Sequence, residues 1–296
     1  MVPSTRDDIG LGTWRRERTT VVRRAVSAPE CGPLPSAIVA ESELTGVPTE
    51  WSPHSHPMHE LVWVRGGTLT SRVGNRIFTV PAGFGLWIPA GVVHGGRLTA
   101  KVNFCDAFFA PDRTPVAFAG PTSIAMTPLL ESLLLRLVRK DLDAEARART
   151  EAVVFDVLEP SERQFALALP GDPRIDAIAE ALLDDPADDR GLQEWAAHLG
   201  LSDRTITRAF RSATGLSFAQ WRQALRIHGA LVLLSEGADV RRVSEWLGYA
   251  QPSTFIAAFR RVMRVTPGVL ANTRSGIESD VRNPVSPVPD TGLPTA

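Results

Sequence analysis

The feature that most constrains the fold is a weak internal repeat near the C-terminal end of the chain. The stretches LGLSDRTITRAFR (199–211) and LGYAQPSTFIAAFR (247–260) both begin with Leu-Gly and end with Ala-Phe-Arg. A short helix, a turn with glycine and a second helix that begins after serine or proline are typical of a helix-turn-helix. Two such units, joined by a helix from about Phe218 to Leu234, predict an all-α domain with two helix-turn-helix motifs.

In the first unit, the sequence separates a buried side of the second helix from an outward side. Gly200 supplies the turn, Ser202 is placed to cap the helix, and Ile206 and Phe210 are predicted to point to the core. Arginine can bind guanine through two hydrogen bonds, and threonine can bond a base edge or contact a thymine methyl group. Residues of these types follow the outward side at a spacing that suits a major groove: Arg204, Thr207, Arg208 and Arg211.

Charge is distributed unevenly along the chain. The formal net charge is −1, but the segment from Gly200 to Arg274 holds eleven arginines against four acidic residues, a local charge of +7. Such a basic segment is expected where phosphate is bound, and a solvated helical surface gives the same pattern. The charge alone therefore does not decide between the two.

The sequence also bears on the compartment. It contains no run of about 18 apolar residues and no signal-peptide pattern. Cys31 and Cys105 stand apart from any Cys/His cluster. We therefore expect a cytoplasmic protein with reduced thiols and no membrane partner.

The segment from Pro48 to about Phe109 has the pattern of short β-strands. ELVWVRGG, LTSRV, RIFTV and GLWIP are rich in Val, Ile, Phe, Trp and Thr and are separated by Gly, Asn and Pro. The stretch RVGNRI predicts a tight hairpin. Several such strands without intervening helices predict a β-sandwich or a small barrel.

From Thr127 the pattern changes to an amphipathic helix, and a second apolar stretch follows around 153–158. Leucines at helical spacing belong either to a core or to a contact between two subunits, and the sequence does not separate these cases. Our hypothesis is a contact between the subunits of a homodimer, formed by Leu130, Leu133, Leu134 and Leu137.

These patterns divide the chain into five segments. Residues 1–47 form an N-terminal extension with the first strands, and 48–120 form the strand-rich domain. Residues 121–171 are expected to be a helical linker with a possible role in dimerisation. The DNA-binding domain spans 172–272, and the tail 273–296, rich in Pro, Ser, Thr and Asp, is expected to be disordered.

At the repeated units the chain resembles the AraC-type transcription regulators. The resemblance rests on LGLSDRTITRAFRSATGLSFAQWRQALRIHGALVLL and VSEWLGYAQPSTFIAAFRRVMRVTPG. It implies two helices that read DNA, here called the reading helices, at Asp203–Ser212 and about Pro252–Val262, which enter successive major grooves. Arg204, Thr207 and Arg208 fall on base-contact positions of the family.

The second reading helix departs from the family's pattern. Ile256 and Ala257 stand where polar or basic residues are frequent, and Val269-Leu270 replaces the usual Tyr-Arg after the final proline. Without hydrogen-bonding groups, these two side chains can offer only methyl contacts to thymine. We therefore expect the second unit to add affinity more than sequence reading, through contacts from Ser253, Ile256, Ala257 and Arg260.

The strand-rich segment contains the stretch HSHPMHE (54–60). Together with Gly67 and the later stretch GFGLWIPAGVVH, it is similar to both halves of the cupin signature. Cupins are double-sheet jelly rolls, so the resemblance implies a cupin barrel followed by helices, ahead of the double helix-turn-helix domain. It also implies that a metal, where present, is held by His54, His56, Glu60 and His94.

Strand geometry gives a reason for these four residues to converge. Alternate residues of a strand share one face, so 54, 56 and 60 are expected to project inward from one strand, with His94 on a neighbouring strand and His59 facing out. Imidazoles with one carboxylate suit Fe, Mn, Ni, Zn or Cu. The four residues are predicted to hold either one divalent transition metal or the polar end of an effector. We expect four aromatic residues to belong to the core and not to a ligand cage: Trp51, Trp63, Trp87 and Phe104.

Two functions from different classes fit these features. The first is a sequence-specific transcription regulator, not an enzyme, that binds operator DNA as a homodimer, responds to a small-molecule effector and acts on RNA polymerase. The alternative is a metal-dependent cupin enzyme, a dioxygenase or isomerase, with an attached DNA-binding domain. The regulator is preferred, because the DNA-binding pattern is complete and no general base or second substrate motif accompanies the metal ligands.

Overall fold

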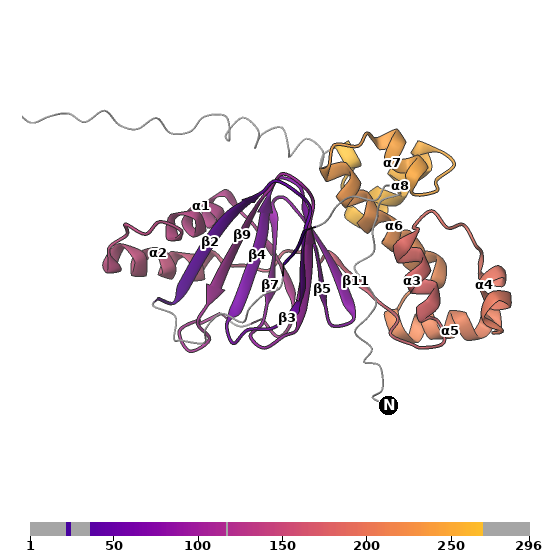
Figure 1. Cartoon of the computed structure of the whole chain (residues 1–296), viewed down its shortest axis with the longest axis horizontal. Coiled ribbons are helices and arrows are strands. Elements are labelled where there is room, and N and C mark those ends of the chain that lie inside the picture. The colour runs from indigo at the N-terminus through magenta and orange to yellow at the C-terminus, as the bar shows by residue number, and fades with distance from the viewer. Residues whose placement is uncertain (1–21, 25–35, 117, 269–296) are drawn as a thin grey trace, which may run out of the picture.

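The computed structural model describes residues 22–24, 36–116 and 118–268, which form a β-sandwich and a helical domain (Figure 1). The tail 273–296, Cys31 and the pair Val269-Leu270 lie outside the described residues. The expected two-part fold, an all-β domain with following helices and an all-α domain, is confirmed. Within the described ranges, no helix is long and apolar enough to span a membrane.

The sandwich consists of two sheets. The first contains β1 (Val22–Arg24), β3 (Thr49–His54), β5 (Thr68–Val73), β6 (Arg76–Pro81), β8 (His94–Leu98) and β11 (Ala166–Ala168). The second contains β2 (Ile38–Thr45), β4 (His59–Arg65), β7 (Phe84–Ile88), β9 (Val102–Phe109) and β10 (Thr122–Ala125). The strand orders are β1-β3-β8-β5-β6-β11 and β10-β7-β4-β9-β2, and of the pairs between these strands only β1 with β3 is parallel.

The expected hairpin joins β5 to β6. Val73 pairs with Arg76, so Gly74 and Asn75 form a two-residue turn. Gly74 has a φ of +58°, a left-handed conformation that glycine adopts without strain. The prediction from RVGNRI is therefore confirmed.

Side chains of the second sheet alternate between two cores. On β4, Val62 and Val64 face the space between the sheets, whereas Leu61 and Trp63 belong to a separate cluster on the outer face. This alternation is the two-residue period of a strand that is buried on both sides. The space between the sheets is therefore the interior of the barrel.

The outer face of the second sheet is covered by α1 (Pro128–Leu137) and α2 (Ala144–Val157) (Figure 1). Leu130 and Leu134 have no exposed surface, and Leu137 is 2% exposed. These leucines pack on the sheet of their own chain, so the hypothesis that this stripe joins two subunits is wrong. Periodicity gave the buried side of the helix correctly but not what buries it.

The segment 121–171 is not a separate linker. Its first strand, β10, pairs with β7, and its last strand, β11, pairs with β6. One strand thus extends each sheet, with α1 and α2 between them. The segment is an integral part of the sandwich.

The helical domain begins at α3 (Asp176–Asp184) and continues with the first helix-turn-helix, α4 (Leu192–Leu199) and α5 (Asp203–Thr214). The linking helix is α6 (Phe218–Ser235), and the second helix-turn-helix consists of α7 (Val240–Trp246) and α8 (Pro252–Met263). As predicted, Gly200 takes a left-handed φ of +64°, and the Ser202 hydroxyl accepts a hydrogen bond from the Thr205 amide at 3.1 Å.

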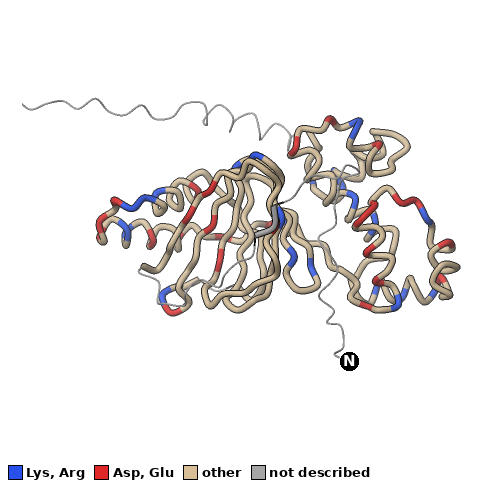
Figure 2. The backbone as a smooth tube through the Cα atoms, viewed as in Figure 1, with Lys and Arg blue, Asp and Glu red and all other residues tan. Residues whose placement is uncertain are grey.

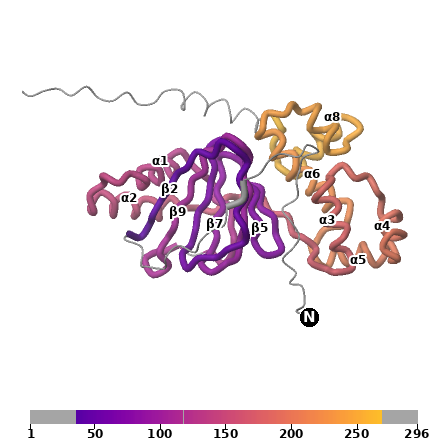
Figure 3. The backbone as a smooth tube through the Cα atoms, in the orientation of Figure 1, coloured from indigo at the N-terminus to yellow at the C-terminus, as the bar shows by residue number. Residues whose placement is uncertain are grey.

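The linking helix α6 also packs on the first sheet of the sandwich (Figure 3). The Trp221 indole N–H donates to the Ala168 carbonyl of β11 at 2.7 Å. The ring of His228 lies 2.8 Å from the Thr79 hydroxyl of β6, and both side chains are buried. The helix α6 thus contacts β5, β6 and β11, and Ile77 of β6 and Leu167 of β11 share one apolar cluster with residues of the helical domain.

Candidate DNA interface and effector cavity

The first reading helix, α5, has one buried and one exposed side. Ile206 and Phe210 are fully buried, as expected. The predicted DNA-contact residues lie on the other side, where Thr207 is half-buried and the remaining three are exposed: Arg204, Arg208 and Arg211. The arrangement leaves three guanidinium groups and one hydroxyl available to a groove.

The second reading helix, α8, buries Phe255 and Phe259 and exposes a surface of different chemistry. Ile256 is 37% exposed, and Ala257 is exposed beside it. They line an open hollow whose other residues are polar or basic: Ser253, Arg260, Arg261, Arg264 and Thr266. An apolar centre with arginines around it fits phosphate contacts with little hydrogen-bonding to bases.

Two arginines of the basic segment have a structural role. Arg222 donates to the Arg190 carbonyl at 2.8 Å, and Arg226 donates to the carbonyls of Pro186 and Asp188 at 2.7 and 3.1 Å. Both fasten α6 to the loop between α3 and α4. Basic and acidic residues both occur across the helical domain (Figure 2), so the net charge of +7 overstates the surface available for phosphate.

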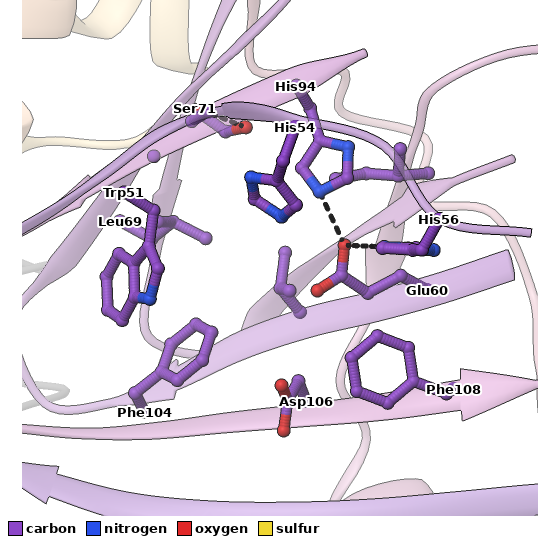
Figure 4. Close-up of a pocket in the computed structure, with 14 residues that line it drawn as sticks. Trp51, His54, His56, Glu60, Leu69, Ser71, His94, Phe104, Asp106 and Phe108 are labelled. Carbon is purple, nitrogen blue, oxygen red and sulfur yellow. Dashed lines mark hydrogen bonds and ion pairs between the residues drawn. The ribbon is translucent and has the colours of Figure 1, made fainter. Parts of the chain in front are cut away.

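A cavity of about 130 Å³ lies inside the sandwich, between the two sheets. All four predicted metal or effector residues line it, together with Trp51, Phe104, Asp106 and Phe108 (Figure 4). The structure thus brings the predicted cluster together around one cavity.

The route by which these residues converge differs from the expected one. His54 ends β3 in the first sheet, His56 lies in the following loop, and Glu60 belongs to β4 in the second sheet. They therefore do not share a face of one strand, and the alternation argument was wrong for them. His94 does lie on the strand next to β3 and pairs directly with His54.

His59 faces away from the cavity, as expected. Its ring stacks on Trp87 with centroids 5.1 Å apart, and its Nδ1 accepts a hydrogen bond from the Ala90 amide at 3.1 Å. Trp87 belongs to the cluster on the outer face of the second sheet. Of the three histidines in HSHPMHE, only two therefore contribute to the cavity.

Backbone carbonyls orient the three cavity imidazoles. In each ring Nδ1 lies 2.9 Å from a carbonyl oxygen: His54 from Ser52, His56 from Met58, and His94 from Val92. A proton on Nδ1 satisfies each contact, and Nε2 of the neutral ring then carries a lone pair. Metal-binding histidines are held in this way by an outer hydrogen bond.

Glu60 lies at the centre of the cluster. One carboxylate oxygen, Oε2, is 3.1 Å from Nε2 of His56 and 3.0 Å from Nε2 of His94. Burial opposes its ionisation, but these two contacts outweigh burial and lower the pKa of Glu60 to about 2. Burial likewise opposes the charged form of His94, yet the contact with Glu60 raises the pKa of that ring. Burial lowers the pKa of His54.

This donor set fits a metal ion. With protons on Nδ1, two Nε2 lone pairs face an ionised carboxylate oxygen, so the cluster needs a positive charge between them, either an added proton or a metal. The three histidines each offer a ligand nitrogen, and these nitrogens lie within 4.8 Å of one another. Three imidazoles and one carboxylate suit a divalent transition metal.

The sequence reasoning missed Asp106 and misplaced two aromatic residues. Trp63 and Trp87 are core residues as predicted, but Trp51 and Phe104 line the cavity with ring centroids 5.1 Å apart. Burial, followed by the negative charges of Glu60 and Glu41, raises the pKa of Asp106 to about 8. The signal in the sequence was a single carboxylate within the aromatic strand VNFCDAFF.

The fold and the cavity define a DNA-binding protein with a separate ligand-binding domain, and comparisons with known proteins agree. Residues 48–110 match the AraC-like ligand binding domain family, and residues 195–273 match a helix-turn-helix domain family. The HTH-type transcriptional regulator NimR of Escherichia coli is 32% identical over 222 residues, which cover 73% of this chain and 80% of NimR. The regulator RipA of Corynebacterium glutamicum is 28% identical over 254 residues, covering 78% and 67%.

Among solved structures, ToxT of Vibrio cholerae aligns with 81% of this chain and 99% of its own, at 12% identity and a TM-score of 0.36. The sequence relatives decide the family. The chain belongs to the AraC-type transcription regulators, with an N-terminal ligand-binding domain and a C-terminal helix-turn-helix DNA-binding domain.

Proposed function

We propose that an effector bound in the sandwich cavity controls how the two reading helices meet DNA. The observation that carries this proposal is the docking of α6 on the sheet that forms one wall of the cavity. Leu69 and Ser71 of β5 line the cavity. Thr68 lies on the other face of the same strand, and its hydroxyl is 3.5 Å from the Leu231 carbonyl of α6. One strand therefore contacts the cavity on one side and the linking helix on the other.

In this proposal the two reading helices have different roles. Arg204, Thr207, Arg208 and Arg211 of α5 read base edges in the first half-site. The second helix, α8, holds the chain on DNA through methyl contacts and phosphate contacts. Its residues in that role are Ser253, Ile256, Ala257 and Arg260.

The proposal assigns a divalent transition metal to His54, His56, Glu60 and His94. The support is the closeness of the three imidazole ligand atoms, the contacts of Glu60 with two of these rings, and the orientation of each imidazole by a backbone carbonyl. A bound metal would supply a coordination point for a lone pair of the effector. The protein residues hold the ligand atoms in place.

The remaining parts of the proposal concern the assembly. A homodimer would present two copies of the reading helices to paired half-sites of the DNA. A regulator bound beside a promoter would contact RNA polymerase in the cytoplasm. Relatives that match most of the chain are named as regulators, so we propose no catalytic step. Turnover of a small molecule by the purified chain would instead favour the alternative, a metal-dependent cupin enzyme.

Genome-wide mapping of DNA bound by the full chain, followed by a reporter on the bound promoter, tests the proposal. We expect Val62→Phe, which places a larger side chain in the cavity, to change reporter output while the protein still binds DNA. Val153→Phe, on the exposed side of α2, is the matched control and should behave as the wild type. No enrichment of genomic fragments, or equal output from both variants, contradicts the proposal.

A further inference from the structure

The inner face of the second sheet carries a row of carboxylates. Val62 of β4 pairs with Asp106 of β9, which pairs in turn with Glu41 of β2. Directly opposed residues point to the same face, so Glu41 lies on the face of Asp106, and Glu43 and Glu60 share it by the two-residue period. Asp106 and Glu60 line the cavity, whereas Glu41 and Glu43 are exposed at its edge.

The described side chains that line the cavity bring no fixed positive charge to Asp106 and Glu60. None of the fourteen residues that line it is lysine or arginine (Figure 4). A divalent metal at the imidazole cluster would outweigh the single charge of Glu60, but Glu41 and Glu43 at the edge of the cavity, and Asp106 once ionised, would remain negative. An anionic effector would therefore meet repulsion on entry, whereas a cation would be attracted.

Aromatic rings surround the carboxyl group of Asp106. Phe104 and Phe108 precede and follow it on the same face of β9, and Trp51 approaches from the opposite sheet (Figure 4). Faces of aromatic rings attract cations and flat groups. A cavity of about 130 Å³ is comparable to an engineered cavity of about 150 Å³ that accepts benzene. The part of the ligand that lies inside the cavity is thus about one ring in size.

We infer that the effector is a small, flat organic cation, of about one ring, whose positively charged nitrogen pairs with Asp106 and whose ring lies against Trp51 and Phe104. This inference names the ligand class of the cavity and rests on the proposed role of that cavity in regulation.

A neutral ligand is the competing possibility, because a protonated Asp106 can donate a hydrogen bond to a carbonyl group. The cation gains more from the site. It converts Asp106 to a charged partner, its N–H groups make charge-assisted hydrogen bonds, and the other carboxylates of the row attract it further. A neutral amide of the same shape gains only one ordinary hydrogen bond.

Three probes of the same shape and different charge test this directly: benzamidine, which is a cation, benzamide, which is neutral, and benzoate, which is an anion. Their binding to the full chain is measured by isothermal titration calorimetry at about pH 8, after chelator treatment and again with zinc added. We expect benzamidine to bind about tenfold or more tightly than benzamide, and benzoate to bind weakest.

Variants test which residues of the cavity cause the preference for benzamidine over benzamide. Asp106→Asn should reduce the preference for benzamidine over benzamide to less than about threefold. Trp51→Leu should weaken both probes. Asp112→Asn, an exposed carboxylate beyond the end of β9, is the matched control and should keep the wild-type preference. Circular dichroism confirms that each variant is folded.

The outcomes separate this inference from the proposed function. Benzamide or benzoate binding as tightly as benzamidine overturns the cationic class, and so does an unchanged preference in Asp106→Asn. Failure of benzamidine to bind also overturns it. In each case the regulatory role of the cavity is decided separately, by the reporter output of Val62→Phe.

Discussion

Replacing Asp106 with asparagine should stabilise the ligand-free protein, and the gain should grow as the pH rises from about 4 to about 8. The pKa of this carboxyl group is raised from 3.8 to about 8, because burial and neighbouring carboxylates disfavour its charge. Between these two values the folded chain binds a proton that the unfolded chain has released. Wild-type stability therefore falls as the pH rises through this window, whereas asparagine does not titrate.

The size of this stability difference follows from the shift in the pKa of Asp106. A rise of about four units corresponds to about 6 kcal/mol at about 1.4 kcal/mol per unit. The side chain of Asp106 keeps some exposed surface, so solvent screens its charge, and we expect a difference of about 2–3 kcal/mol between pH 4 and pH 8. Asparagine has nearly the shape of the protonated acid, so the packing of Phe104 and Phe108 is preserved.

Urea denaturation followed by tryptophan fluorescence at several pH values between about 5 and 8 measures this difference. Asp112→Asn, exposed to solvent, serves as the control and should show no such trend. A stability gain that does not change with pH, or a loss at about pH 8, would refute the assignment of Asp106 as a carboxyl group that is neutral below about pH 8.

Four further changes test the two reading helices, the imidazole cluster and the core of the sandwich. Arg208→Ala should lower operator affinity by about 1–3 kcal/mol and leave binding to random DNA unchanged; a wild-type ratio of the two affinities contradicts its role. Arg260→Ala should weaken all sequences about equally and flatten the salt dependence, whereas a sharply defined G/C-rich second half-site speaks against this. His94→Ala should lose the metal, measured by elemental analysis, while DNA binding persists. Leu134→Lys should destabilise the sandwich by several kcal/mol, because it buries a charge; a stably folded variant would show that Leu134 is not buried.

The helix-turn-helix units were predictable because local interactions define them. Gly200 allows the left-handed turn, and Ser202 caps the next helix, so both boundaries are set by residues adjacent in sequence. The hairpin at Gly74 follows for the same reason. The short strands β10 and β11 were missed because each has fewer than five residues and is defined by its pairing with a distant strand.

The cavity cluster was predictable in composition but not in geometry. The resemblance to cupins gave all four residues, although the argument from one continuous strand was wrong. Pro57 interrupts HSHPMHE, and a proline within a run argues against a continuous strand. The chain crosses from the first sheet to the second at this point, so His54 and Glu60 meet across the sandwich.

The role of Asp106 in the cavity could not be predicted from the sequence. An isolated carboxylate in a strand has no partner spacing that marks it as a binding residue. Its role depends on the register that places it between Phe104 and Phe108 on the inner face. That register is set by pairing across three strands, which a single sequence does not reveal.

The docking of α6 restricts how a signal can pass from the cavity to DNA. An α-helix of 18 residues is about 27 Å long, and α6 separates the two reading helices, which in the proposed complex enter grooves about 34 Å apart. Its contact with the sandwich includes the buried His228, whose pKa burial lowers to about 4. The ring is therefore neutral at ordinary pH, and its contact with Thr79 does not respond to protons there. Thr79 belongs to β6, next to β5, which lines the cavity, so we propose that a signal from the cavity would reach this contact as a movement of the sheet.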